Sequence, residues 1–411
     1  MIKRIFNKNF IVLLDQAVFS GGSFVTTIIL ARFLLSTLDF GLFSSLLLFN
    51  YAVVSVLNAL IIQPLQVSIS KQVDQKSYVS FSFITQVLLI VILALSLQVL
   101  NALKIDLLSS FRGFEGAVIL YIIGFLMNDY FRKLFLAKSE VVNAFLVDFL
   151  TIGSQLILLF VLWYNSESEF STVVFYLGFS YLPGLIYSLF VVGYKMPDLD
   201  LFKEYVLLHF HQGKWLLLTS ITQWWSSNLF VVFSGLFLGV EMLGAFRLVQ
   251  SLFGVLNLIL QTFENFVLPE AARKLVESKE IAKKYLLRIS LKSSVIFGIM
   301  LAVLFFFSST VIQLVGGEKY VPYSFIVKGM VLLYVFIFLG YPIRIAIRIL
   351  VLNKVFFTGY LLSFLFSLIT FYFLLIEFGM NGAIVGLISA QIITLGYWQF
   401  VLKKHNFILW K

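Results

Sequence analysis

The stretch GAFRLVQSLFGVLNLILQTFENFVLP (244–269) is long and apolar enough to cross a bilayer as a helix, yet it carries a seam of polar residues. The members of this seam are Arg247, Gln250, Asn257, Gln261 and Glu264. Their spacings of three, seven, four and three residues place all five on one helical face. Because polar groups in lipid are costly unless they face protein or water, the seam indicates an aqueous cavity inside a helix bundle. Transport is therefore the leading hypothesis.

The composition of the whole chain points the same way. Of its 411 residues, 61% are hydrophobic and only 12% are charged, and the mean hydropathy is +1.01. The charged share is about half of the roughly 25% that is usual in soluble domains. The chain is therefore predicted to be an integral membrane protein.

Several functional classes are excluded by residue types that are missing or scarce. The chain contains no cysteine, so disulfides, thiolate catalysis and Cys-ligated metals are ruled out. Its three histidines, His209, His211 and His405, are too few and too scattered for a metal site, and no cofactor is expected. The net charge of +10 is better explained by cytoplasmic loops rich in Lys and Arg than by a nucleic-acid partner.

Twelve stretches are long and apolar enough to span a membrane, and a more polar segment at 195–214 separates six from six. The predicted spans are 10–34, 40–64, 78–100, 115–136, 142–163, 171–193, 215–238, 243–268, 285–309, 322–350, 356–376 and 381–402. The expected organisation is an N-terminal half (1–194), a cytoplasmic connecting segment (195–214) and a C-terminal half (215–411). With the N-terminus inside, 24 of the 30 Lys and Arg residues fall on the cytoplasmic side, so both chain ends are predicted to be cytoplasmic.

The two halves echo each other in sequence. ARFLLSTLDFGLFSSLLLF (31–49) and SGLFLGVEMLGAFRLVQSLF (234–253) share an apolar helix end, an acidic residue and a Gly-x-Phe that opens the next helix. Both of these next helices are predicted to end at a proline, Pro64 and Pro269. Six helices per half give the repeats the same orientation, related by a pseudo-two-fold axis along the membrane normal. The expected fold is therefore an all-α polytopic membrane protein with twelve helices in two six-helix halves.

Polar residues inside the predicted spans are the candidates for a substrate cavity. The cavity candidates are Gln16, Arg32, Asn58, Gln223, Trp224, Asn228, Arg247, Gln250, Asn257, Gln261, Arg344 and Arg348. Simpler roles stay open for them: Asn and Gln can bond neighbouring helices, and Arg side chains can reach the headgroups. Asp129 and Asp148 are further polar residues inside the spans. Their simpler roles are to be solvated near the cytoplasmic helix ends or to pair with Arg132 and Lys133.

The opening of the chain resembles a known family. LLDQAVFSGGSFVTTIILARFL (13–34) followed by STLDFGLFSS (36–45) is similar to the start of bacterial polysaccharide flippases, with an acidic residue, a small-residue cluster, Ala-Arg-Phe-Leu and an acidic-Phe-Gly turn. That family belongs to the multidrug/oligosaccharidyl-lipid/polysaccharide exporter superfamily. The specific motifs cover mainly residues 13–64, while the predicted architecture matches over the whole chain.

The resemblance implies a substrate and a mechanism. It implies that undecaprenyl-diphosphate-linked oligosaccharide is moved across the bacterial plasma membrane by alternating access, for O-antigen, capsule or exopolysaccharide synthesis. Arg side chains would contact the diphosphate, and Gln, Asn and Trp the sugars. Asp15 and Glu264 are candidates for coupling to H⁺ or Na⁺. The implied partners are membrane lipids, a polysaccharide polymerase and a chain-length regulator.

Three other functions fit the sequence less well. A multidrug exporter of the same superfamily is the nearest alternative, although it would favour an acidic, aromatic cavity over one with Arg. A peptidoglycan-precursor flippase usually has additional helices. A membrane-embedded polymerase would need catalytic groups on a large outer loop, but the longest outer loop, around 101–114, is short, and the sequence shows no catalytic constellation. The protein is therefore not expected to be an enzyme.

Overall fold

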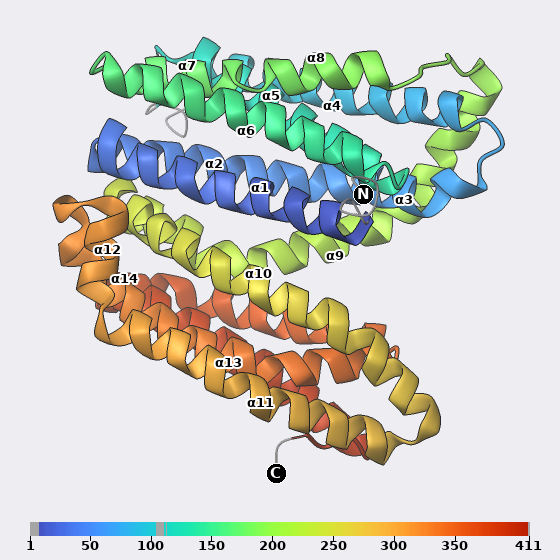
Figure 1. Cartoon of the computed structure of the whole chain (residues 1–411), viewed down its shortest axis with the longest axis vertical. Coiled ribbons are helices and arrows are strands. Elements are labelled where there is room, and N and C mark those ends of the chain that lie inside the picture. The colour runs from blue at the N-terminus through green and yellow to red at the C-terminus, as the bar shows by residue number, and fades with distance from the viewer. Residues whose placement is uncertain (1–7, 104–110, 112, 410–411) are drawn as a thin grey trace, which may run out of the picture. The chain divides into compact units, whose positions relative to one another are not determined.

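The computed structural model describes residues 8–103, 111 and 113–409. Within these residues every regular element is a helix and none is a strand (Figure 1). The predicted cytoplasmic N-terminal residues 1–7 and most of the predicted outer loop at 101–114 lie outside the described residues. The chain divides into two compact units, Met1–Ile221 and Thr222–Lys411.

The first unit is built from helices that pack mainly side by side. In chain order its elements are α1 (Lys8–Ile29), η2 (Leu30–Leu34), α2 (Thr37–Leu57), η3 (Asn58–Ile62), α3 (Gln63–Ser68), η4 (Ile69–Lys71), α4 (Gln75–Ala102), α5 (Glu115–Ala137), α6 (Val141–Tyr164), α7 (Phe170–Phe179), α8 (Leu182–Val191) and the first part of α9 (Leu199–Leu238). Helix α1 packs on α6, while α5 contacts α2, α6, α7 and α8. This packing makes α5 a central helix of the unit.

The second unit begins within α9. Its further elements are α10 (Val240–Glu277), α11 (Lys279–Phe306), α12 (Ser308–Gly316), η6 (Glu318–Tyr323), α13 (Ser324–Ile349) and α14 (Asn353–Lys404). Helix α13 contacts α10, α11 and α14. Its buried Ile345 and Ala346 belong to a core that also holds Trp398 and Leu402 of α14.

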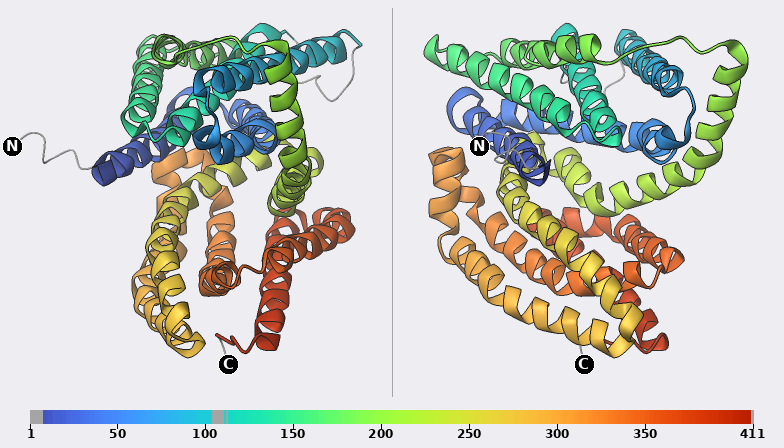
Figure 2. Two further views of the ribbon diagram at one scale, coloured as in Figure 1. Left: turned by 90° about the vertical axis from the view of Figure 1, so that its right-hand side faces the viewer. Right: turned by 45° about the vertical axis from the view of Figure 1, so that its right-hand side comes forward.

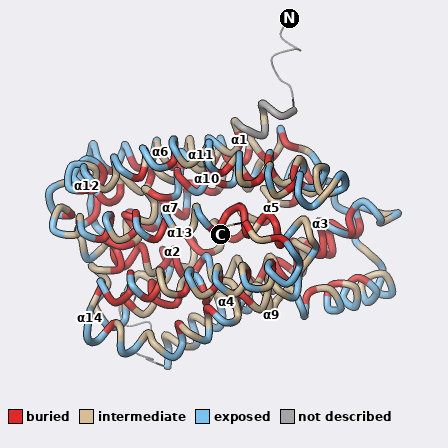
Figure 3. Tube along the Cα trace, turned by 90° about the horizontal axis from the view of Figure 1, so that it is seen from below, coloured by how far each residue is buried: buried red, intermediate tan, exposed pale blue. Residues whose placement is uncertain are grey.

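Each of the twelve predicted spans coincides with helical structure. Helices α7 and α8 share one span, and α14 contains the last two because its backbone breaks at Gly379. In the described part of the chain, nine helical stretches are long and apolar enough to cross a membrane. On α4, α11 and α14 most of these residues are not buried, as the pale blue of α4 and α14 in Figure 3 shows, which suits helices that face lipid. The predicted fold, an all-α polytopic membrane protein of two six-helix halves, is confirmed.

The predicted helix ends at the two prolines are wrong. Helical structure continues through Pro64 to Lys71, and α10 continues through Pro269 to Glu277. A proline within a helix leaves the carbonyl four residues earlier without its usual donor. At Pro64 that carbonyl belongs to Leu60, and the ring nitrogen Nδ1 of His209 lies 3.0 Å from it. A side chain from α9 therefore supplies the bond that Pro64 cannot make.

The predicted connecting segment is mostly helix. From Leu199 onward it forms the first part of α9, which runs to Leu238 as one unbroken ribbon in Figure 2. Only the stretch just before it, around Lys195, is irregular. There Lys195 Nζ lies 2.5 Å from Asp74 Oδ2, and Asp74 caps α4 by accepting from the backbone N–H of Ser77.

The two arms of α14 meet at a turn that only glycine fits. Gly379 has a φ of +55°, a left-handed conformation that glycine adopts without strain. A Cβ added to Gly382 would overlap the backbone carbonyl of Leu374, whereas one added to Gly396 would meet no atom within 4 Å. The close approach of these two arms therefore depends on the missing side chain at Gly382.

We predict that Gly382→Ala destabilises the protein by about 1–3 kcal/mol, because the backbone must move to admit the methyl group. Thermal unfolding of the purified chain in detergent measures this as a lower midpoint. Gly396→Ala is the matched control on the same helix, and it is expected to leave the midpoint unchanged. Equal midpoints for both variants would contradict the tight turn.

The Asp74 carboxylate makes the stability of the fold depend on pH in the acidic range. Its hydrogen bond from Lys195, followed by those from Ser77, lowers the pKa of Asp74 from 3.8 to about 2. A carboxyl group whose pKa is lower in the folded state stabilises the fold above its unfolded pKa. That contribution is lost as the pH falls from about 4 to about 2. Asp74→Asn should lower the unfolding midpoint at neutral pH and flatten this part of its pH profile. Asp200→Asn, at a side chain that is 96% exposed, should not do so.

Candidate functional site

Three buried charges form a cluster within the first unit. Arg132 of α5 donates from Nη2 to Asp15 Oδ2 of α1 at 2.9 Å, and from Nε to Asp148 Oδ2 of α6 at 2.6 Å. The Arg132 guanidinium also lies 4.1 Å from the ring centroid of Phe19. Asp15 is only 3% exposed and Asp148 only 1%. We call Asp15, Arg132 and Asp148 the N-half cluster.

The N-half cluster is not electrically balanced by its own members. Two carboxylates share one guanidinium, so with all groups ionised the cluster carries one negative charge. The second carboxylate oxygens, Oδ1 of Asp15 and Oδ1 of Asp148, are buried and accept no hydrogen bond from the described residues. Buried acceptors of this kind are rare without a proton, a cation or a water beside them. The geometry therefore suits a site for a proton or a small cation.

More polar residues continue the network along α5. Lys133 Nζ donates to Asp129 Oδ2 at 2.7 Å and to Asn58 Oδ1 at 2.9 Å. One turn away, Thr151 donates to Asn128 Oδ1 at 2.8 Å. The network ties α2 and α6 to α5. Asp129 pairs with Lys133 and Asp148 with Arg132, so the simpler alternative considered for these two carboxylates is confirmed.

A cavity of about 320 Å³ opens beside these residues, entirely within the first unit. Its lining mixes aromatic and polar side chains: Phe19, Ser23, Tyr51, Val54, Phe125, Asn128, Asp129, Arg132, Lys133, Asp148, Thr151, Ile152, Gln155 and Tyr181. Four of its polar residues, Asn128, Asp129, Arg132 and Lys133, come from α5. We call this space the N-half cavity.

A second cluster, of opposite sign, lies in the second unit. Glu264 of α10 is buried and accepts a hydrogen bond from Arg348 of α13, while Arg344 Nε lies 3.9 Å from Glu264 Oε2. The side chains of Arg344 and Arg348 are 34% and 45% exposed, against 8% for Glu264. Arg344 Nε donates no hydrogen bond within the described part of the chain. We call Glu264, Arg344 and Arg348 the C-half cluster.

The C-half cluster carries one positive charge when its groups are ionised. Its Arg344 guanidinium lies about 6 Å from the rings of Tyr341 and Phe356. The prediction gives Arg348 a role in phosphate contact and Glu264 a role in ion coupling, but the structure brings the two together. A carboxylate held between two guanidinium groups is poorly placed to attract a further cation. The geometry instead leaves positive charge for an anion.

The polar seam of α10 does not stay on one buried face. Arg247 donates to Gln250 Oε1 at 2.8 Å, and both are half-buried. Asn257 and Gln261 are exposed, whereas Glu264 is buried. The five residues of the seam therefore follow one face of the helix but differ in how far they are buried.

Two of the remaining predicted cavity residues form hydrogen bonds within their own helices. Gln16 donates to Ser20 on its own helix, and Asn228 donates to the carbonyl of Trp224. Arg32 is exposed in the π-helical turn η2, and Gln223 is half-buried. Asn58 alone among these is bonded into the network around the N-half cavity.

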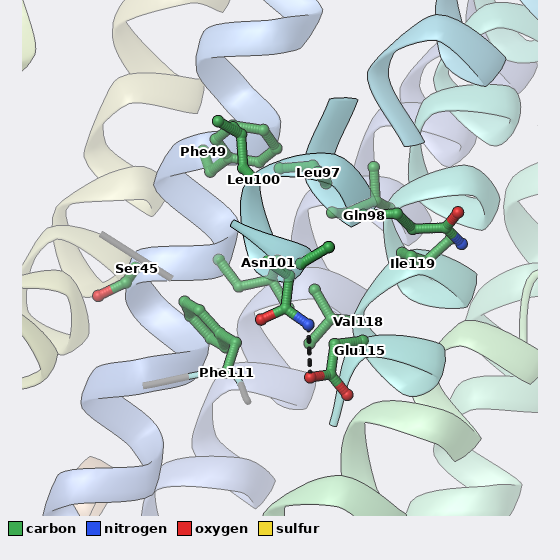
Figure 4. A pocket seen from close by; sticks show the side chains of 13 residues that line it. Ser45, Phe49, Leu97, Gln98, Leu100, Asn101, Phe111, Glu115, Val118 and Ile119 are labelled. Carbon is green, nitrogen blue, oxygen red and sulfur yellow. Dashed lines mark hydrogen bonds between the residues drawn. The ribbon is translucent and has the colours of Figure 1, made fainter. Parts of the chain in front are cut away.

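A larger and mostly apolar cavity of about 450 Å³ lies among α2, α4 and α5 (Figure 4). Its polar corner is a hydrogen bond of 2.9 Å from Asn101 Nδ2 to Glu115 Oε1, drawn as the dashed line. Glu115 also accepts from the backbone N–H of Gly113. The remaining walls are chiefly aliphatic and aromatic side chains, so this cavity offers little polar chemistry.

Several residues around the N-half cavity are absent from the sequence-based set of candidates. Arg132 and Lys133 appear there only as alternative partners of Asp129 and Asp148, and the aromatic residues Tyr51, Phe125 and Tyr181 receive no role. The signal that could identify Arg132 is its position four residues after Asn128, on the same helical face and within an otherwise apolar stretch. The aromatic residues give no such signal in a chain with 47 phenylalanines.

Comparison with known proteins identifies the fold. No model of a known protein family matches the chain, and no curated protein matches it. Among solved structures, an inward-facing multidrug resistance MATE family transporter of the MOP superfamily aligns with a TM-score of 0.70 at 12% identity, covering 95% of both chains. The lipid II flippase MurJ, in an inward closed conformation, aligns with 0.71 at 13% identity, covering 96% of this chain and 87% of that one.

A third similar structure is a MOP superfamily transporter from Pyrococcus furiosus. It aligns with a TM-score of 0.56 at 14% identity, covering 97% of this chain and 96% of that one, and it is described as having a binding pocket of reverse polarity that suggests a different function. At such low identity the similarity concerns the fold. The chain therefore has the fold shared by these MATE and MurJ structures.

We predict that Arg132→Met destabilises the protein by about 3–5 kcal/mol, because it leaves two buried carboxylates without their cation. Adding Asp15→Asn and Asp148→Asn to it should restore much of the lost stability, since no uncompensated charge remains. Thermal unfolding in detergent measures both effects. Lys203→Met, which removes the cation of an exposed ion pair, should change the midpoint little. A triple variant no more stable than Arg132→Met would contradict the role of charge pairing.

Proposed function

We propose that this chain is a flippase of the bacterial plasma membrane. Its substrate is an undecaprenyl-diphosphate-linked oligosaccharide used to build O-antigen, capsule or exopolysaccharide. It works by alternating access, with both chain ends in the cytoplasm. A polysaccharide polymerase and a chain-length regulator are its expected partners. The fold supports transport, and the sequence similarity of residues 13–64 to polysaccharide flippases supports this substrate class.

The observation that carries the proposal is the positive charge of the C-half cluster. Two guanidinium groups serve one carboxylate, and both are more than one-third exposed. Arginine is well suited to phosphate, because its planar guanidinium can donate two parallel hydrogen bonds. Arg344 also has a buried Nε–H that no described residue accepts. This arrangement supports contact with a diphosphate group.

The N-half cluster supports ion coupling. Asp15 and Asp148 together leave two buried oxygens unbonded around a single guanidinium, so one proton or small cation would balance the cluster. Asp15 is therefore the better of the two coupling candidates, because Glu264 already lies between two guanidinium groups. A proton gradient or a sodium gradient would then drive transport.

A multidrug exporter is the second candidate. One of the similar structures is a multidrug resistance transporter, and the N-half cavity combines aromatic rings with carboxylates. The carboxylates of that cavity, however, are paired with Arg132 and Lys133, which leaves them less able to attract an organic cation. The drug sensitivity of a deletion strain would distinguish this function from polysaccharide export.

We predict that Arg344→Gln combined with Arg348→Gln reduces transport of a fluorescent lipid-linked oligosaccharide in proteoliposomes by at least about tenfold, because charged hydrogen bonds to the diphosphate are lost. Arg273→Gln is the matched control, since Arg273 is exposed and pairs with Glu270 on its own helix. It should leave transport unchanged. Normal transport by the double variant would refute the proposed phosphate contact.

The predicted contacts of Arg32 and Arg247 are tested in cells. Arg32→Ala and Arg247→Ala should each lower the amount of surface polysaccharide while the protein still reaches the membrane. Membrane fractions probed for the protein separate loss of transport from loss of the protein. Normal surface polysaccharide in both variants would remove these two residues from the substrate path.

A further inference from the structure

We infer that the N-half cavity is a binding subsite for one neutral sugar ring of the substrate. The inference rests on the proposed function and extends it, because it assigns the sugar to residues outside the predicted set. Four features of the cavity support it: an aromatic wall, unpaired hydrogen-bonding groups, a balanced charge and a small volume.

The aromatic wall is continuous. The rings of Tyr51 and Phe125 meet edge to face with centroids 5.8 Å apart, and those of Phe125 and Tyr181 do so at 6.3 Å. Tyr51 is 41% exposed, so its ring is accessible. The C–H face of a pyranose ring is apolar and packs on an aromatic face. The wall therefore offers a surface that suits a sugar better than a simple ion.

The lining also holds polar groups that can form hydrogen bonds with a ligand. The side-chain amide nitrogens of Asn128 and Gln155 donate no hydrogen bond within the part of the chain that the structure describes, although their oxygens accept from Thr151 and Thr26. Asp129 Oδ1 likewise accepts none there, because Lys133 bonds Oδ2. These groups supply free donors and an acceptor. Sugar hydroxyls, which both donate and accept, are complementary to such a set.

The lining of the N-half cavity holds as many cations as carboxylates, so its charge favours neither an anionic nor a cationic occupant. Within the lining itself Asp129 pairs with Lys133 and Asp148 with Arg132, while Asp15, which shares Arg132, does not line the cavity. The two carboxylates would repel a phosphate, and Lys133 and Arg132 would repel an organic cation. A neutral polyhydroxylated group is repelled by neither set of charges. The volume of about 320 Å³ lies near the lower limit of ordinary ligand pockets, which suits one ring and not a whole oligosaccharide.

Saturation-transfer NMR on the purified full chain in nanodiscs tests the subsite, with the methyl glycosides of glucose, galactose and N-acetylglucosamine as probes. We expect transfer to the ring protons of at least one glycoside. Tyr51→Ala and Asp129→Asn should each weaken its binding by about fivefold, through loss of a stacking surface and of a charged acceptor. Phe149→Ala is the control, since Phe149 is an exposed aromatic residue of α6 outside the cavity lining.

Several outcomes would overturn the subsite. These are no transfer to any glycoside, binding that neither cavity variant weakens, or binding of tetraphenylphosphonium alone, which would indicate an organic-cation pocket. Transport in proteoliposomes separates this failure from failure of the proposed function. Transport of lipid-linked oligosaccharide that is unaffected by both cavity variants would refute the subsite and retain the flippase. If sugar binding depends on Tyr51 and Asp129 but the chain transports no lipid-linked oligosaccharide, the subsite is supported and the flippase function is refuted.

Discussion

The shared ion pair of Arg132 with Asp15 and Asp148 is the interaction on which the first unit depends. Ionised groups within apolar helices are tolerated when they find partners, and here one guanidinium satisfies carboxylates from two other helices. This requirement fixes which faces of α1, α5 and α6 meet. It also places polar groups of α5 along one side of the N-half cavity, so packing and the candidate site have the same cause.

The second unit also holds a cluster of paired charges, but there the cations outnumber the carboxylates. There one carboxylate, Glu264, serves Arg344 and Arg348, and the guanidinium groups remain partly exposed. A cluster with spare carboxylate oxygens suits a proton or a small cation, whereas a cluster with spare guanidinium donors suits an anion. The two units thus share helical architecture while differing in the ligands that their charges favour.

The fold was predictable because length and hydropathy decide whether a segment spans a membrane, and all twelve predicted segments are helical. Helix ends were less predictable. A proline weakens a helix by leaving one carbonyl unbonded, but at Pro64 the distant His209 supplies a bond to Leu60. The candidate site was harder still. Periodicity tells which face of its own helix Asn257 or Glu264 occupies, but burial depends on neighbouring helices, so one is exposed and the other is buried.

Partner choice explains why Asp15 was predicted as a site residue, whereas Arg132 entered the prediction only as an alternative partner of the carboxylates. An isolated acidic residue in an apolar helix is conspicuous, whereas a cation near a helix end is expected from the charge bias of cytoplasmic loops. Only packing reveals that Arg132 turns toward the carboxylates and not toward lipid headgroups. Its pairing also removes the attraction that bare carboxylates would exert on organic cations. The positive C-half cluster and the charge-balanced N-half cavity together therefore fit a substrate with an anionic diphosphate and neutral sugars better than a cationic drug.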